Sequence, residues 1–318
     1  MSLMQSIQQT QNDNKVIQYI DLTKEVNNLP VGVNISTMCA TAKIKSSNSD
    51  IPIELYIDNI EKYKRLNSND IIRIKRSDVS DRSFLTHKQK KKRKQSETPK
   101  KKQINYFYNQ ITLVIRINEG LTNDIEKEPK INLKLFKNGS IQMSGCKSLY
   151  NINIVLNKLI KRLTETHTIK TDDGNEYQIT YLNNPNITIS NFKIDMINSN
   201  YQVNMKIDRE NLYSLLKKKS IKCSYEQCIR ACVVVKYTPP NYNVDEKQVS
   251  IYIFRKGNII ITGARDRDHI ISAYNYINNI LITHSDEINM VDENKTDEIL
   301  FKLYEIVMDK INKGLISL

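Results

Sequence analysis

Two stretches of the sequence decide the fold: LKLFKNGSIQMSGCKSLYNINIVLNKLIKRL, which begins at Leu133, and IYIFRKGNIIITGARDRDHIISAYNYINNIL, which begins at Ile251. Phe136 in the first stretch matches Phe254 in the second, and two glycines follow each Phe at the same spacing. Each matching pair is separated by 118 residues. Agreement over this length indicates an internal repeat.

Each copy of the repeat has the pattern of a β-hairpin followed by a helix. In the first copy, Leu133 and Leu135 alternate with polar residues, and Ile141 and Met143 do the same after the Asn138-Gly139 turn. Such alternation is typical of strands that are buried on one face, and the glycine permits the positive φ of a tight turn. A helix follows, with Ser148 as the expected N-cap in the first copy and Asp266 in the second. Apolar residues recur at helical spacing as Ile152, Leu156, Leu159 and Leu163, and as Ile270, Tyr274, Ile277 and Leu281.

The sequence before each hairpin completes the same scheme. Residues 34–44 and 191–194 are predicted as opening strands, 54–63 and 208–218 as short helices, and 111–117 and 232–237 as further strands. Strands and helices in this order predict an α+β fold, with an antiparallel sheet and helices on one of its faces. The other face then meets solvent or a ligand.

Four segments follow from this scheme. We expect an N-terminal tail over residues 1–29, a first repeat over 30–166 with a basic insertion at about 64–103, a second repeat over 183–290, and a C-terminal helix over 294–318. The apolar residues Ile299, Leu303 and Ile306 form the stripe of that helix.

The chain has 318 residues, a net charge of +13 and 39% hydrophobic residues. This composition supports a folded core, and no apolar run has the length of about 18 residues that a membrane span needs. The first residues lack an apolar segment, so we expect no secretion signal. Five Cys without framework spacing fit a reducing compartment.

Much of the positive charge lies in KQKKKRKQSETPKKK, from Lys88 to Lys102, which holds nine basic residues and one Glu. Such a run is expected to be a solvated loop. It either contacts nucleic acid, serves as a nuclear-import signal, or only raises solubility. Its candidate contact residues are Lys90, Lys91, Lys92, Arg93, Lys94, Lys100, Lys101 and Lys102.

The repeated hairpin resembles the TATA-box-binding protein family, whose repeats carry the pattern Leu-Ile-Phe-x-Ser-Gly-Lys-x-Val-x-Thr-Gly-Ala-Lys. Here the pattern is present as LKLFKNGSIQMSGCK and IYIFRKGNIIITGAR, and the family's opening Asn is present as Asn34 and Asn191. The resemblance implies two pseudo-symmetric repeats that form a saddle. It also implies a transcription initiation factor that binds A·T-rich duplex DNA in the minor groove and bends it with inserted apolar side chains. The heavy use of Asn, Ile and Lys, which is typical of an AT-rich genome, together with the insertion and the divergence suggests a large DNA virus or an AT-rich protist as the source.

The resemblance and the alternation together predict the DNA-binding residues. Phe136 and Phe254 are expected to point away from the helices and to wedge between bases. The remaining candidates on the same face are Asn34, Asn191, Lys134, Gln142, Ser144, Tyr252, Ile260 and Thr262.

The sequence departs from the family at the second wedge of each pair. Counting back from Arg116 and Lys236 places these wedges near Gln110 and Arg230, and neither is apolar. A weaker bend is therefore expected. An alternative hypothesis is a saddle-shaped protein-interaction platform of the transcription machinery, with weak or lost DNA binding; the long loops over 118–130 and 238–248 fit it.

The resemblance implies partners similar to general transcription factors IIA and IIB and to a multi-subunit RNA polymerase. It places the protein in the nucleus, or in a cytoplasmic virus factory or virion if the source is a virus. The sequence predicts no enzyme, cofactor or metal site, because no nucleophile–base pattern appears and Cys223, Cys228 and Cys232 lack paired spacing. We expect these three thiols to be free and buried.

Overall fold

The computed structural model describes residues 16–47, 51–63, 71–76, 82–83, 107–117, 129–170, 175–229, 231–240, 248–290, 301 and 303–310. The chain divides into two compact units. Unit 1 contains the described residues up to Leu29, then Ile35–Asn198 and Arg265–Arg267; unit 2 contains Pro30–Asn34, Ser199–Ala264 and the described residues from Asp268 onward.

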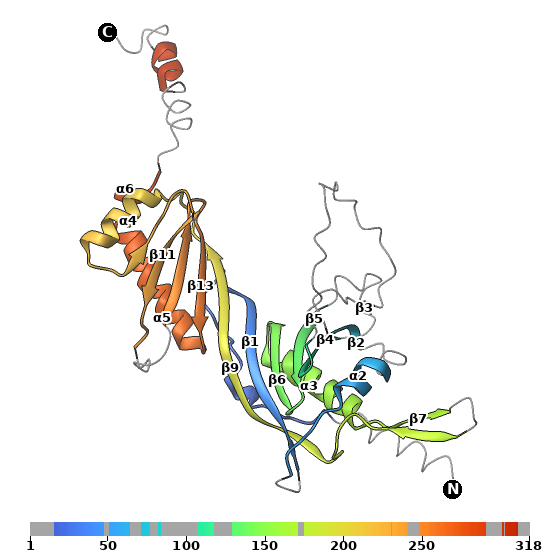
Figure 1. The fold of residues 1–318 in the computed structure, drawn as a ribbon. Coiled ribbons are helices and arrows are strands. Elements are labelled where there is room, and N and C mark those ends of the chain that lie inside the picture. The colour runs from blue at the N-terminus through green and yellow to red at the C-terminus, as the bar shows by residue number, and fades with distance from the viewer. Residues whose placement is uncertain are drawn as a thin grey trace, which may run out of the picture. The chain divides into compact units, whose positions relative to one another are not determined.

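Unit 1 is an antiparallel sheet with helices packed against it (Figure 1). Its strands lie in the order β1-β6-β5-β4-β2-β3, and β9 lies beside β1. Helix α3 packs against β6, and α2 against β4. The elements are η1 (Leu22–Lys24), β1 (Asn34–Ser46), α2 (Ile57–Tyr63), β2 (Ile71–Lys75), β3 (Arg82–Ser83), β4 (Gln110–Arg116), β5 (Lys130–Phe136), β6 (Ser140–Cys146), α3 (Leu149–Thr164), β7 (His167–Lys170), β8 (Glu176–Ile179) and β9 (Ile187–Gln202).

Unit 2 repeats the architecture with the strand order β10-β11-β12-β13, and the last residues of β9 belong to it. Helix α4 packs against β10 and β11. Helix α5 lies against β11, where Tyr237 and Tyr276 stack with their ring centroids 4.4 Å apart. The elements are α4 (Arg209–Lys218), β10 (Cys223–Ser224), β11 (Cys232–Tyr237), β12 (Val249–Phe254), β13 (Asn258–Ala264), α5 (Arg267–Thr283) and α6 (Ser285–Ile288). Both units are α+β, as predicted.

The core of each unit is built from the alternating residues. Leu133, Leu135 and Met143 are fully buried in unit 1, as are Ile251 and Ile253 in unit 2. Burying a side chain of this size contributes roughly 1.5–3 kcal/mol. Because neighbouring residues along a strand point to opposite faces, burial of this set leaves the intervening residues on the other face.

Most predicted elements are present, and several have different ends. Strand β11 begins and ends at the predicted residues, α2 is shorter than predicted, and β9 extends well beyond residues 191–194. Ser148 caps α3 as predicted, accepting a hydrogen bond from the Asn151 amide at 3.1 Å. The predicted stripe on α3 is buried; on α5, Tyr274 is only half-buried, and its ring lies 4.8 Å from that of Tyr201.

Three features were not predicted from the sequence. Strand β2 lies inside the expected insertion and pairs with β4, so this insertion contributes to the sheet. The β7–β8 hairpin forms a separate two-stranded sheet. The basic run Lys88–Lys102 and most of the long loops, residues 118–128 and 241–247, lie outside the described residues.

Residues 16–29, expected as a tail, pack along α3 instead. The Asn157 side chain accepts a hydrogen bond from the Ile17 amide at 2.8 Å, and that of Asn153 accepts one from the Tyr19 amide at 2.9 Å. Glu25 accepts hydrogen bonds from the Leu149 and Tyr150 amides at 2.7 and 3.1 Å. A carboxylate at this position satisfies free amides and complements the positive end of the helix dipole.

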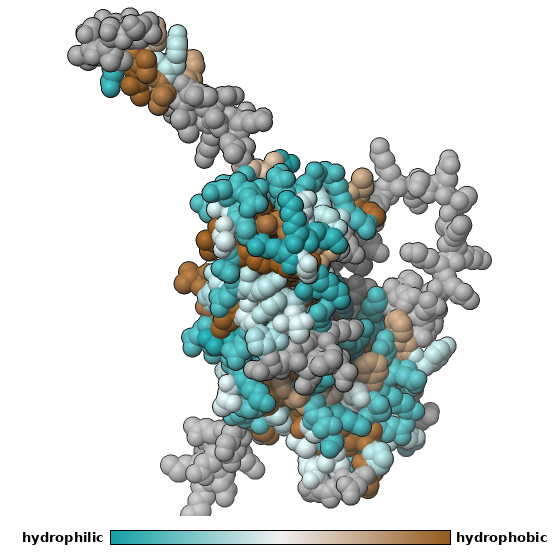
Figure 2. Space-filling model, turned by 90° about the vertical axis from the view of Figure 1, so that its left-hand side faces the viewer, coloured by the Kyte–Doolittle hydropathy of each residue, from teal (hydrophilic) through white to brown (hydrophobic). Residues whose placement is uncertain are grey.

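The C-terminal helix is present at residues 301 and 303–310. Apolar side chains lie on its surface (Figure 2), and Phe301 and Tyr304 are more than half exposed. Across the described part of the chain, no helix has the length and apolar character needed to cross a membrane.

The hairpin glycine of unit 2 provides a test of how tightly the turn is held. Gly257 has φ +80°, and an added Cβ would lie 2.7 Å from the Met205 carbonyl oxygen and still closer to that of Val203. Gly32 has a similar φ of +85° and no neighbouring atom near its Cβ position. We expect Gly257→Ala to lower the free energy of unfolding by roughly 3 kcal/mol, since it adds overpacking to the conformational cost.

Gly32→Ala should cost only the conformational part, about 1–2 kcal/mol. Chemical denaturation of both variants compares the two costs. Equal losses in the free energy of unfolding for the two variants would contradict the close approach of the chain after β9 to the Gly257 turn.

Candidate nucleic-acid interface

The predicted wedge residues occupy the same place in both units. Phe136 ends β5 and Phe254 ends β12, each directly before the hairpin turn, and both rings are half-buried. They alternate with Leu135 and Ile253, which are fully buried on the helix side. Each Phe therefore lies on the face of the sheet away from the helices.

We call these faces the first open face and the second open face. The first consists of Lys134, Phe136, Gln142, Ser144 and the residues paired with them in unit 1; the second consists of Tyr252, Phe254, Ile260, Thr262 and the residues paired with them in unit 2. Directly paired residues in an antiparallel sheet share a face, so the register identifies the members of each.

The first open face is polar and cationic. One row across it runs Thr41, Gln142, Lys134, Thr112 and Lys75. A second row runs Ser144, Asn132, Val114 and Arg73. The sequences of β1, β2, β4, β5 and β6 contain no Asp or Glu, so no carboxylate on these strands offsets the lysines.

The second open face is more apolar. The row equivalent to the first one runs Ile260, Tyr252, Val234 and Ser224. The next row is polar, with Thr262 opposite Ser250 and Ser250 opposite Lys236, whose ammonium group donates to the Ser250 hydroxyl at 2.6 Å. The two faces thus differ mainly in one row.

Three predicted site residues come together in unit 2. Asn34, Phe254 and Ile260 line one hollow of about 520 Å³. Asn200 and Gln202, two amide residues of the neighbouring strand β9, line it as well. The hollow thus combines an aromatic ring with hydrogen-bonding groups.

The surroundings of Phe136 in unit 1 are different. Phe136 lines a hollow of about 430 Å³ together with Glu54 and Lys137, which form an ion pair at 2.9 Å. Tyr108, at the adjacent end of the sheet, is 76% exposed. Phe136 therefore lies beside a solvated ion pair.

Asn191 has a conformational role that the sequence does not reveal. It lies within β9 with φ +52°, in the left-handed region that Asn tolerates better than most residues. Asn34, its partner in the predicted symmetry, donates to the Gly32 carbonyl at 3.1 Å. Both residues are exposed.

The strand register shows which residue lies opposite each Phe. Gln110 is opposite Phe136, as the count along the sequence predicts. Cys232 is opposite Phe254, whereas the count had selected Arg230. The starting points of the count, Arg116 and Lys236, are not equivalent in register: Arg116 pairs with the first residue of β5, and Lys236 with the second of β12. Arg230 itself lies outside the described residues.

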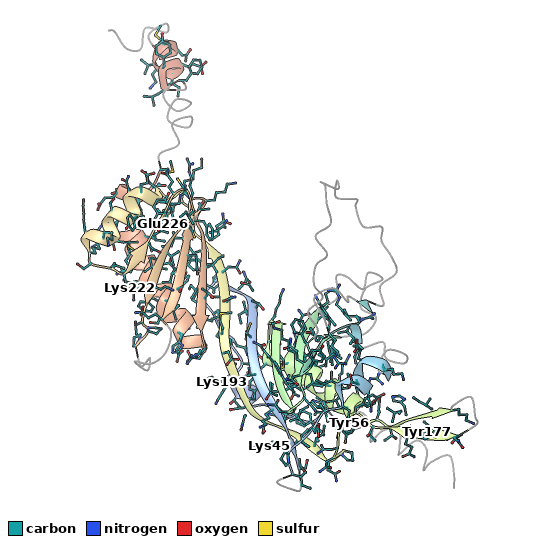
Figure 3. The ribbon with its side chains drawn as sticks, viewed as in Figure 1. Lys45, Tyr56, Tyr177, Lys193, Lys222 and Glu226 are labelled. Atoms are coloured by element: carbon teal, nitrogen blue, oxygen red, sulfur yellow. The ribbon has the colours of Figure 1, made fainter. Side chains whose placement is uncertain are left out.

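Positive charge also lies on the two long strands. Lys45 of β1 and Lys193 of β9 are exposed (Figure 3). The residues of the basic run, from Lys90 to Lys102, lie outside the described part.

Burial keeps Cys39 and Cys146 in the thiol form. Burial raises the pKa of Cys146 to about 12 and also raises the pKa of Cys39, where the nearby Asp195 adds to the shift. Thiols with such pKa values stay protonated and are poor nucleophiles. Cys232 is buried as expected, Cys223 is half-buried, and Cys228 is exposed, which corrects the expectation for both. Cys228 is exposed because it belongs to a turn after β10 rather than to a strand. Among the described residues, no cluster of ligands could hold a metal ion.

Comparison with known proteins identifies the family. Residues 191–284 match the family model of transcription factor TFIID, or TATA-binding protein, TBP. A TATA-box-binding protein-like protein of Acanthamoeba polyphaga mimivirus is 34% identical over 290 residues, which cover 86% of this chain and 71% of that protein. The solved Methanococcus jannaschii TBP aligns with 80% of this chain and 98% of its own, at 17% identity and a TM-score of 0.41.

The mimivirus relative shows that the chain belongs to the TATA-box-binding-protein-like family of DNA-binding transcription factors. The family is not one of enzymes. The resemblance predicted from the repeated hairpin is therefore confirmed.

The backbone at Asn191 gives a prediction that separates structure from binding. Asn191→Ala should lower the free energy of unfolding by about 1 kcal/mol, because alanine is strained at positive φ, while Asn191→Gly should leave it almost unchanged. Thermal denaturation of both variants tests this.

If the Asn191 side chain also contacts DNA, both variants should weaken duplex binding to the same extent. A glycine variant as unstable as the alanine variant would show that contacts of the Asn191 side chain, and not its backbone conformation, account for its contribution to stability.

Proposed function

We propose that the protein is a transcription initiation factor that binds A·T-rich duplex DNA in the minor groove with its two open faces and bends it. The observation that carries this proposal is the pair Phe136 and Phe254, which occupy one register position in both units, on the faces away from the helices. Family membership supports the proposal. Half-exposed rings at matched positions are suited to insertion between base pairs.

The energy available from the two rings is comparable to the cost of bending. Burying a Phe side chain contributes roughly 1.5–3 kcal/mol, so two rings contribute about 3–6 kcal/mol. Bending a site of 20–30 base pairs by 40–90° costs about 1–6 kcal/mol. Removal of both rings should therefore remove most of the bend.

The positions opposite the rings favour a shallow bend. Gln110 and Cys232 face the two Phe residues across the strands, and the Cys232 side chain is buried. Neither supplies a second large apolar wedge. Each unit thus inserts less apolar surface than a pair of rings would.

The lysines of the first open face contribute a second, electrostatic component. Lys75 and Lys134 belong to this face, and Lys43 shares it because it follows Thr41 by two residues along β1; all three lie on strands without carboxylates. Cations that neutralise phosphates release counterions, so affinity should fall steeply as salt rises. A·T preference depends on the groove contacts, and the salt dependence on the lysines.

A protein-interaction platform with weak DNA binding is a second candidate, favoured by the absence of a large apolar side chain opposite either Phe. Under either candidate, we propose partners among general transcription factors similar to IIA and IIB and a multi-subunit RNA polymerase. The relative from mimivirus supports a viral setting, in a virus factory, virion or nucleus.

The bending role is tested by end-to-end FRET on an A·T-rich duplex with wild type and the Phe136→Ala/Phe254→Ala double variant. We expect wild type to shorten the end-to-end distance and the double variant to lose this change. Its affinity should be about 10- to 100-fold lower, because about 1.4 kcal/mol corresponds to tenfold.

Tyr150→Ala is the matched control, since Tyr150 is a 60% exposed aromatic residue on α3. It should bind and bend as wild type does. Absence of bending by wild type, or equal bending by wild type and the double variant, would reject the wedge role. The protein-interaction platform would be favoured if the protein bound duplex DNA negligibly at every salt concentration and captured purified transcription factors.

A further inference from the structure

The two open faces differ in hydrogen-bonding capacity at equivalent positions. We call the row that contains Gln142 in unit 1 and Ile260 in unit 2 the central row. In this row, Gln142 and Lys134 of unit 1 are a cross-strand pair, and Ile260 and Tyr252 of unit 2 are the corresponding pair. Gln142 and Lys134 are exposed, while Ile260 and Tyr252 are half-buried. The next rows are mostly polar in both units, with Val114 as the apolar member in unit 1, so the central row carries the main difference.

The chemistry of the minor groove makes this difference relevant. A·T and T·A pairs present only acceptors there, and a G·C pair adds the amino donor of guanine N2. A donor that is covered by an apolar surface loses its water and gains no partner, which is unfavourable. A face with acceptors can cover the same donor without that loss.

We propose that the two units read the minor groove unequally: unit 2 rejects guanine through Ile260, whereas unit 1 accepts either base pair through Gln142. This inference rests on the proposed function, because it assigns a base preference to each open face. Preferred sites then have one strict A·T half and one half that tolerates G·C.

The strand register supports this division. Gln142 is paired with Thr41 on one side and with Lys134 on the other, and its carboxamide oxygen can accept a hydrogen bond from guanine N2. Lys134 can donate to the acceptors that all base pairs present, or to phosphate. Ile260 takes the position of Gln142, and its side chain offers no acceptor there; the amide groups of Asn34, Asn200 and Gln202 line the same hollow from outside the Ile260–Tyr252 pair.

The experiment compares duplexes that differ in the two halves of one site. The first has A·T pairs in both halves, the second has A·T in one half and G·C in the other, and the third has G·C in both. Because the protein can bind a duplex in either orientation, the mixed duplex lets unit 1 take the G·C half. We expect the mixed duplex to bind within about threefold of the A·T duplex, and the G·C duplex about 10- to 100-fold more weakly.

Inosine tests the chemical cause. An I·C pair lacks the N2 amino group of G·C, so replacing G·C by I·C in both halves should restore affinity to within about threefold of the A·T duplex. Continued weak binding of the I·C duplex would show that groove shape, and not the amino donor, sets the preference, and would overturn the inference.

Two exchanges between equivalent positions assign the effect to the named residues. Ile260→Gln should raise the affinity for the G·C duplex about tenfold or more. Gln142→Ile should make the mixed duplex as weak as the G·C duplex, and because Gln142 is exposed this variant is expected to fold. Circular dichroism confirms folding of both, and either exchange alone tests the assignment.

The outcomes separate the inference from the proposed function. Tight binding to the A·T duplex, with the mixed duplex as weak as the G·C duplex in wild type, would overturn unequal reading and leave minor-groove binding intact. No binding to the A·T duplex would overturn both. Binding of all duplexes with equal affinity would also reject the inference, since it shows contact with phosphates only.

Discussion

The strict alternation of apolar and polar residues along the hairpin strands is the constraint on which the rest of the structure depends. Leu133 and Leu135 in unit 1, and Ile251 and Ile253 in unit 2, are fully buried. A strand can bury only every second side chain on one face, so each buried pair forces Phe136 or Phe254 to the opposite face. A shift of one residue in register would exchange the two faces and remove both the core and the candidate interface.

The two units bury equivalent hairpin positions and differ on their open faces. The hairpin, its turn glycine and the following helix recur 118 residues apart, while Lys134 corresponds to Tyr252 and Gln142 to Ile260. Core positions are restricted by close packing, whereas exposed positions are free to change with the ligand. The differences between the units therefore lie where a ligand would bind.

The sequence predicted local features well and longer-range features poorly. Alternation, the Asn138-Gly139 turn and the Ser148 cap are local, so the hairpin and the start of α3 could be identified. The Glu25 carboxylate on α3 depends on a contact 124 residues away, and no local pattern marks it. Strand β2 lies within a polar, charged region of the sequence and was not predicted. The pairing of Cys232 with Phe254 could be identified only from the observed strand register. A short apolar run, Ile71-Ile72, was the available signal for β2.

Mapping the DNA-facing side with a lysine-reactive reagent tests the central claim most directly. Lys134 lies on the first open face, and Lys161 is an exposed lysine of α3. The full chain is labelled with and without a saturating A·T-rich duplex, and modification at each lysine is measured by mass spectrometry. The account predicts that the duplex protects Lys134 and leaves Lys161 as reactive as before. Protection of Lys161 with unchanged reactivity of Lys134 would contradict it.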